Sequence, residues 1–274
     1  MDVLPPGLVA RPTVYRPQAD TRLLAASLSR EVLGRETDVL EIGTGTGTLA
    51  LHAAGRGARV TAVDVSAMAV ATARMNAWLH RLPLRILHGD FAARTAGQRF
   101  DLVVANPPYV PAPAARLPSR GPERAWDAGP DGRMVIDRIC TSLPALLRPG
   151  GVLLMVHSGL CGAEATVSLL TRMGLIADIA ARVCVPWGPV LRSRRTWLED
   201  QGLVAPAEER EELVMIRAQR LSTLCRMTET AAVPTAGRRP VDAAPPAYGP
   251  RAGSLQLSGL RRAHPCGCVE PRAA

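Results

Sequence analysis

One four-residue run, Asn106-Pro107-Pro108-Tyr109, combines groups that could hold a planar nitrogen. Amide nitrogens and exocyclic amines are poor nucleophiles, because their lone pairs are delocalised. Two acceptors that take both N–H hydrogens would hold such a group and support the positive charge that grows on nitrogen during methylation. The side-chain oxygen of Asn106 and the carbonyl of Pro107 can be those acceptors, and the ring of Tyr109 can lie flat against the planar group. The run therefore predicts catalytic roles for Asn106, Pro107 and Tyr109.

A glycine-rich run, Glu41-Ile42-Gly43-Thr44-Gly45-Thr46-Gly47, follows a strand-like segment and opens a helix-like one. Glycines at such a place let the backbone turn tightly and approach a ligand without an intervening Cβ. The run departs from the dinucleotide fingerprint G-x-G-x-x-G, because Thr48 stands where the third glycine is expected. Glu41 would repel a pyrophosphate but could attract a sulfonium or ammonium cation. The run therefore favours S-adenosylmethionine (SAM) over NAD.

Two further acids follow the next two strand-like segments. Asp64 ends the second of them, where a carboxylate can accept both hydroxyls of a ribose. Asp90 follows the third and precedes Phe91, so that it could accept from an adenine amino group beside an aromatic face. Each acid alone could be an ordinary capping or solvated residue. In register with the glycine turn, they predict a SAM site.

Strand-like and helix-like segments alternate around these runs. The predicted strands span residues 39–42, 59–65, 84–87, 100–105, 151–157, 176–185 and 213–217. The predicted helices span residues 23–33, 48–54, 66–80 (with Ser66 as N-cap), 132–147 and 163–173. This alternation predicts an α/β, Rossmann-like fold with a seven-stranded, mostly parallel sheet and helices on both faces. Residues 110–130 and 186–210 are expected to be long loops, which in a compact domain are usually functional or mobile.

The glycine turn, Asp64, Asp90 and the Asn-Pro-Pro-Tyr run together resemble class I SAM-dependent methyltransferases. Within that class the chain is similar to the HemK-like protein-glutamine methyltransferases, which act on peptide chain release factors. The similarity covers about residues 12–218. Further matching runs are Val14-Tyr15-Arg16-Pro17, Asp20-Thr21, Leu23-Leu24 and Asp127-Ala128-Gly129-Pro130-Asp131-Gly132.

The resemblance implies a set of site residues. In this family the residues matching Asn106 and Pro107 bind the glutamine amide, the one matching Tyr109 packs beside it, and the lead-in closes over the methionine end of SAM. No metal is expected. The expected cofactor-binding residues are Tyr15, Thr21, Glu41, Gly43, Thr44, Gly45, Gly47, Asp64, Val65, Asp90, Phe91 and Asn106.

The chain departs from the family pattern at both ends. Bacterial members usually carry an N-terminal helical domain that grips the release factor, whereas here the first predicted strand begins at residue 39, as in the short form without that domain. The expected organisation is a lead-in with the first helix (1–36), a methyltransferase domain (37–221) and a disordered, basic tail rich in Pro, Arg and Ala (222–274).

The composition bears on partners and location. The net charge is +9 at pH 7, and a basic balance favours acidic partners. Contact with nucleic acid or the ribosome could use the tail or Arg192, Arg194 and Arg195 in the second long loop, although a solvated face is the simpler interpretation. We find neither an apolar run of membrane-spanning length nor a secretory signal, so a cytoplasmic protein without membrane contact is expected.

Several other residues of reactive type are expected to be structural. His157 is predicted to be a buried structural histidine, and Cys140, Cys161 and Cys184 are predicted to be small core residues. The run from His264 to Cys268 offers too few and too closely spaced ligands for a closed zinc site.

The leading hypothesis is a SAM-dependent N-methyltransferase whose acceptor is a glutamine side chain in a protein such as a release factor. One alternative keeps the chemistry and places it on an exocyclic amine of a base in RNA or DNA. The other is a SAM-binding protein that acts without catalysis. The sequence gives no indication of the oligomeric state.

Overall fold

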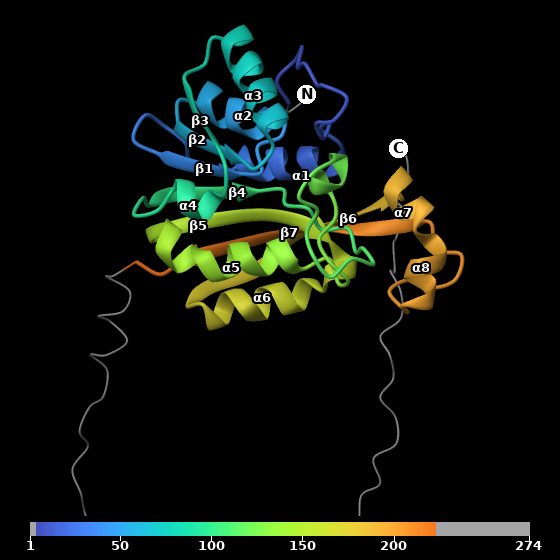
Figure 1. The fold of residues 1–274 in the computed structure, drawn as a ribbon. Helices are drawn as coiled ribbons and strands as arrows, with labels where there is room; N and C mark the ends of the chain where they lie inside the picture. Colours follow the sequence, from blue (N-terminus) through green and yellow to red (C-terminus); the bar gives the residue numbers. More distant parts are fainter. Residues whose placement is uncertain (1–3, 223–274) are drawn as a thin grey trace, which may run out of the picture. The chain divides into compact units, whose positions relative to one another are not determined.

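Seven strands form one sheet in the order β3-β2-β1-β4-β5-β7-β6 (Figure 1). The computed structural model describes residues 4–222, so the predicted tail lies outside the described residues. Neighbouring strands from β3 to β5 are parallel, whereas β7 is antiparallel to both β5 and β6. The strands are β1 (Asp38–Ile42), β2 (Arg59–Asp64), β3 (Leu84–His88), β4 (Phe100–Ala105), β5 (Leu147–Ser158), β6 (Leu175–Pro186) and β7 (Arg210–Arg220). The predicted seven-stranded, mostly parallel sheet is therefore confirmed.

Helices cover both faces of the sheet. Figure 1 shows α1, α2 and α3 on one side of the strands and α5 and α6 on the other, and each group has its own core cluster of buried residues. The helices are α1 (Ala19–Leu28), α2 (Thr48–Gly55), α3 (Ala67–Leu79), α4 (Phe91–Arg94), α5 (Met134–Leu146), α6 (Ala163–Arg172), α7 (Pro189–Ser193) and α8 (Arg195–Asp200), with 3-10 turns η1 (Pro122–Ala125) and η2 (Gly159–Cys161).

The central strand β4 is apolar on both of its faces because helices cover both sides of the sheet there. Leu102 and Val104 belong to the core on the α1–α3 side, whereas Val103 and Ala105 belong to the core on the α5–α6 side. Successive side chains of a strand point to opposite faces, so a strand covered on both faces must be apolar throughout. The strand ends directly before Asn106, which places this residue at the carboxyl ends of the parallel strands.

The first helix differs from the prediction of residues 23–33. It begins earlier, at Ala19, and ends at Leu28. The guanidinium of Arg56 donates to the carbonyls of Leu28 (2.6 Å) and Glu31 (2.9 Å). A helix terminates readily where its last carbonyls find such partners outside the helix. The earlier start places Asp20 and Thr21 inside the first turn of the helix.

The expected loop over residues 186–210 is the second difference, because it contains the two short helices α7 and α8. Trp187 is almost fully buried and packs with Leu191 and Leu198 in a small third core. Pro189 stands in the first turn of α7, where its fixed φ favours a helix start. A cluster of this kind has no periodic signature in the sequence, so the prediction of a plain loop was wrong.

Within residues 4–222 we find no helix that is both long and apolar enough to cross a membrane.

Candidate active site

A cavity of about 460 Å³ opens at the edge of the sheet where the parallel strands end. The strand order reverses between β1 and β4, and in open α/β sheets ligands bind in the crevice at such a switch point. Its volume falls in the usual range for small-molecule sites. It is lined by residues of the lead-in (12–18, 20 and 21), the glycine turn and the start of α2 (41, 43–46, 48 and 49), the segment 64–66, residue 69, the run 106–110, residues 121, 122 and 124–126, the segment 188–191, and Glu211.

The glycine turn forms the floor of this cavity. Gly43 and Gly45 line it, and a Cβ built on them would lie 3.8 Å from the carbonyl of Asn106 and 3.9 Å from that of Tyr15. Gly47 is not among the lining residues. Its φ is +82°, and a Cβ there would lie only 3.1 Å from the Cβ of Ala73 in α3. A Cβ at either of the first two glycines would therefore make only ordinary contacts, whereas Gly47 allows the turn to pack closely against α3.

Glu41 lies buried beneath the turn. Its Oε2 accepts from the hydroxyl of Thr44 (2.5 Å) and from the backbone N–H of Ala50 (3.1 Å) in α2. Burial raises the pKa of this carboxyl to about 8, against the opposing effect of those hydrogen bonds. A ligand that brings positive charge or hydroxyl donors into the cavity would therefore favour its ionised form.

Asp64 ends β2 with both oxygens aimed at the backbone of the neighbouring turns. Oδ2 accepts from the N–H of Gly45 (2.9 Å) and Oδ1 from the N–H of Ser66 (2.8 Å). A carboxylate can accept about four hydrogen bonds, so each oxygen keeps capacity for a ligand hydroxyl. Burial raises its pKa. This geometry fits the predicted binding of ribose hydroxyls, with Val65 beside it in the cavity wall.

Asp90 and Phe91 are not brought into the lining of this cavity. Asp90 accepts from the N–H of Ala93 at the start of α4 (3.2 Å) and forms an ion pair with Arg138 (2.6 Å). Phe91 is buried in the core, and the guanidinium of Arg138 lies 5.1 Å from its ring centre. Their assignment to an adenine slot stays a prediction.

Asn106, Tyr109 and Tyr15 converge on one carboxylate, that of Asp20. Its Oδ2 accepts from the hydroxyl of Tyr15 (2.7 Å), the amide of Asn106 (3.1 Å) and the hydroxyl of Tyr109 (3.1 Å). Burial and the nearby carboxylate raise the pKa of both tyrosines, which therefore keep their protons and donate. Pro107 also lines the cavity. The site predicted from the sequence did not include Asp20, although the Asp20-Thr21 pair was one of the runs that match the family.

The lead-in is held at a second place by Asn76, a buried residue of α3. Its side chain accepts from the N–H of Val9 and donates to the carbonyl of Val9, both at 2.9 Å. It also donates to the carbonyl of Thr46 in the glycine turn (2.9 Å). One amide thus connects the lead-in, α3 and the glycine turn.

Glu211 is a second acid that the predicted site omitted. It lies in β7, whose start reaches the same edge of the sheet because this strand runs antiparallel to β5. Burial raises its pKa to about 7, a hydrogen bond from Ser158 lowers it, and the charge of Asp20 raises it. Its Oε2 is buried and has no hydrogen-bond partner among the described residues. The sequence pattern missed it because the predicted strand began only at residue 213.

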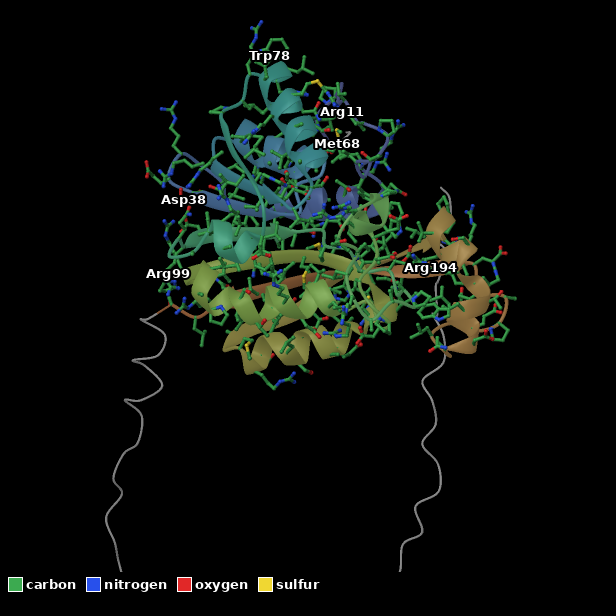
Figure 2. All side chains as sticks on the ribbon, in the orientation of Figure 1. Arg11, Asp38, Met68, Trp78, Arg99 and Arg194 are labelled. Atoms are coloured by element: carbon green, nitrogen blue, oxygen red, sulfur yellow. The ribbon has the colours of Figure 1, made fainter. Side chains whose placement is uncertain are left out.

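The arginines of the α7–α8 segment mostly have partners within the chain. Arg194 forms an ion pair with Asp127 (2.5 Å) and donates to the carbonyl of Pro111 (2.9 Å); Figure 2 labels this side chain beside α7 and α8. Arg195 pairs with Glu209 (3.2 Å) and stacks over Trp187. Both arginines therefore connect parts of the fold. Contact with nucleic acid through this segment stays a prediction.

His157 and the cysteines are placed mainly in the core. His157 is fully buried, and burial lowers its pKa to about 4, so the ring is neutral. Cys140 and Cys161 are buried as predicted, whereas Cys184 is only half-buried. Among residues 4–222 no group of three or more His, Cys, Asp or Glu side chains is arranged to hold a metal ion.

Part of this chain is similar in sequence to known proteins. The family model described as "Methyltransferase small domain" matches residues 11–117. A Methanocaldococcus jannaschii protein provisionally named a protein N5-glutamine methyltransferase is 35% identical over 181 residues, which cover 66% of this chain and 90% of that protein. The release factor glutamine methyltransferase of Bordetella pertussis is 38% identical over 60% of this chain and 63% of its own length. That of Geobacter sulfurreducens is 34% identical, over 61% and 60% respectively. The chain thus spans less than two thirds of these two bacterial relatives.

Solved structures share the fold. A chain from the E. cuniculi Mtq2–Trm112 complex, responsible for methylation of the termination factor eRF1, aligns with a TM-score of 0.54 and 21% identity over 76% of this chain and 99% of that chain. The precorrin-8w decarboxylase of Methanobacterium thermoautotrophicum aligns with a TM-score of 0.52 and 19% identity, over 77% and 95% respectively.

Proposed function

The chain belongs to the protein N5-glutamine methyltransferase family of SAM-dependent enzymes, and we propose that it methylates the side-chain amide of a glutamine in a peptide chain release factor. The observation that carries the proposal is the position of the Asn106-Pro107 pair. It ends β4 and lines the same cavity as the glycine turn, Glu41 and Asp64. The residues proposed to bind the methyl donor and the pair proposed to hold the amide therefore line the same cavity.

The residues of the cavity fit SAM. When bound there, SAM supplies an electrophilic methyl group on a sulfonium sulfur. Asp64 would hold the ribose hydroxyls through its free acceptor capacity, and the buried carboxyl of Glu41 would favour a cationic ligand. Tyr15 and Thr21 line the side formed by the lead-in, where the methionine end would lie.

The acceptor amide would be held by Asn106 and Pro107. The Oδ1 of Asn106 and the carbonyl of Pro107 would each take one N–H, which fixes the nitrogen and stabilises its growing positive charge. Tyr109, whose hydroxyl donates to Asp20, would form one side of the space for the acceptor amide. Methyl transfer would break the sulfur–methyl bond of SAM, with its electron pair left on sulfur, and the methylated nitrogen would lose one proton to water to give the neutral N-methyl amide.

The choice of a protein acceptor rests on the relatives. The bacterial proteins above are named for methylating a glutamine of a release factor, and they are 38% and 34% identical to this chain over the matched segments. The alternative acceptor, an exocyclic amine of a nucleic-acid base, needs the same pair of hydrogen-bond acceptors.

A transfer assay separates these acceptors. The full chain is incubated with methyl-labelled SAM and a purified release factor carrying a Gly-Gly-Gln tip, and the modified residue is located by mass spectrometry. We expect label on the glutamine of the tip and none when that glutamine is replaced by alanine. Label that enters only RNA or DNA from a cell lysate contradicts the glutamine assignment. SAM binding without transfer to protein or nucleic acid would contradict an enzymatic role.

A further inference from the structure

Asp20 is the most heavily hydrogen-bonded side chain at the cavity. It is 3% exposed, and it lies in the first turn of α1, where the helix dipole favours a negative charge. Its Oδ1 accepts from the N–H (2.6 Å) and hydroxyl (3.1 Å) of Thr21. Its Oδ2 accepts from Tyr15, Asn106 and Tyr109. All five donors are neutral groups.

This carboxylate determines which way the amide of Asn106 points. An ionised carboxylate only accepts hydrogen bonds, so the atom of Asn106 that lies 3.1 Å from Oδ2 must be the donor Nδ2. The opposite orientation would place two oxygens against each other beside a full negative charge. With Nδ2 engaged, Oδ1 is the atom left to face an acceptor in the cavity.

The chemistry proposed for this site requires that orientation. An acceptor amide or amine presents N–H hydrogens, so it needs Oδ1 of Asn106 and would be repelled by the hydrogens of Nδ2. An unrestrained amide can turn over by rotating about χ2. The hydrogen bond to Asp20 therefore keeps Oδ1 of Asn106 toward the acceptor and prevents the inactive orientation, in which Nδ2 would face it.

We propose that Asp20 is a positioning residue that fixes the amide of Asn106 with its oxygen toward the methyl acceptor and connects it to the lead-in through Tyr15. This proposal rests on the methyl transfer proposed above but concerns a different residue. Asp20 acts through Asn106. It touches neither the donor methyl group nor the acceptor nitrogen in this scheme.

Asp20→Asn is the sharpest substitution, because it keeps the volume and cannot keep all five hydrogen bonds. We expect turnover on the acceptor to fall by about 10–100-fold, the scale on which small misplacements of reacting groups act, with a smaller change in KM. In the Asn106→Ala background the same substitution should change the rate less than about twofold, because the group it positions is gone. Asp137→Asn removes a carboxylate from the first turn of α5, away from the cavity, and should leave the rate unchanged.

A readout that needs no acceptor accompanies the kinetics. The side-chain NH₂ signals of Asn106 in the ¹⁵N-labelled full chain are identified by their loss in Asn106→Ala. We expect these signals to be protected from solvent exchange in the wild type and to shift and lose protection in Asp20→Asn. Tyr15→Phe and Tyr109→Phe, which remove other donors from the same oxygen, should retain the protection.

The possible results distinguish failure of the positioning role of Asp20 from failure of the proposed function. Unchanged Asn106 signals in folded Asp20→Asn, or an equal loss of rate in the presence and absence of the Asn106 side chain, overturns the positioning role. Absence of transfer to glutamine by the wild type contradicts the proposed function instead, and the signals of Asn106 still decide the role of Asp20.

Discussion

The carboxylate of Asp64 lies at the end of β2 with one backbone N–H on each oxygen. Asp64→Ala removes the acceptors expected for both ribose hydroxyls, so SAM binding should weaken by about 1.5–3 kcal/mol, the usual value of hydrogen bonds to a charged group. Isothermal calorimetry measures this change. An affinity equal to that of the wild type would remove Asp64 from the cofactor site.

Asn106 is expected to affect the rate of methyl transfer strongly and the affinity for SAM hardly at all. Asn106→Ala should lower single-turnover methyl transfer by about 10²–10³-fold, the loss typical of one preorganised polar partner of a transition state. SAM affinity, measured by the same calorimetry, should stay close to that of the wild type, since the cofactor is expected to be held mainly by residues other than Asn106. A variant as fast as the wild type on the true acceptor would contradict the mechanism whatever the acceptor is.

Glu211 gives the stability of the protein a pH dependence. Its pKa of about 7 in the folded chain lies above the ordinary value of 4.5, so the native state binds this proton more tightly than the unfolded state. Its unfavourable effect on stability therefore grows as the pH rises from 4.5 to 7 and is complete above 7. Glu211→Gln should stabilise the protein at pH 8 by about 3.5 kcal/mol, at about 1.4 kcal/mol per pKa unit, and hardly at pH 4.5.

Thermal unfolding of both proteins at pH 8 and pH 5 measures this difference. Glu36→Gln is the matched control, because the side chain of Glu36 is 93% exposed. Removing an exposed ion-paired charge changes stability by at most about 1 kcal/mol. A gain for Glu211→Gln that is independent of pH would show that its carboxyl does not titrate as described.

At the scale of the elements, the glycines show two separate reasons for having no side chain: a positive φ and a close neighbour. Gly47 has a positive φ and a close neighbour in Ala73, whereas Gly97 has a similar φ of +74° and nothing within 4 Å of a built Cβ. Gly97→Ala should therefore cost about 1–2 kcal/mol for backbone strain alone. Gly47→Ala should cost about 1–3 kcal/mol more, for overpacking between the turn and α3. Chemical denaturation compares the two, and equal losses would mean that α3 shifts without cost.

The sequence predicted those elements whose pattern is local. The glycine turn, the strand ending at Asn106 and the helix capped by Ser66 were all confirmed, because apolar periodicity and caps specify them directly. The end of α1 was predicted wrongly, because it depends on Arg56, a residue far along the chain. The third core around Trp187 was missed for the same reason, since its partners come from separate segments.

The candidate site was predictable to the extent that its residues stand at strand ends. Asp64 and Asn106 were proposed from their place after apolar strands and both line the cavity, whereas Asp20 and Glu211 reach it through tertiary contacts. Asp20 reaches Asn106 from a helix, and Glu211 reaches the cavity because β7 reverses direction. The Asp20-Thr21 pair matched the family without indicating a role for the carboxylate, and Glu211 had no signature in residue type or spacing.

At the scale of the whole molecule, the cavity draws on the lead-in and on several strands of the sheet. A ligand bound there should stabilise the whole unit. SAM at about 100 times its dissociation constant should contribute about 2.7 kcal/mol and raise the melting temperature by about 5–10 °C. Differential scanning fluorimetry measures the shift, with NAD at the same concentration as the control. A shift with NAD equal to that with SAM would contradict the cofactor assignment.

The lead-in is fastened at two points, at Val9 by Asn76 and at Tyr15 by Asp20, and the residues between them form one wall of the cavity. Release of a bound molecule would be slowed if this wall had to open first, and release rather than chemistry limits many enzymes whose sites close. The strength of the two attachments would then set the residence time of the spent cofactor. Sequence changes at Asn76, remote from the reacting atoms, would alter how quickly the enzyme becomes ready for its next turnover.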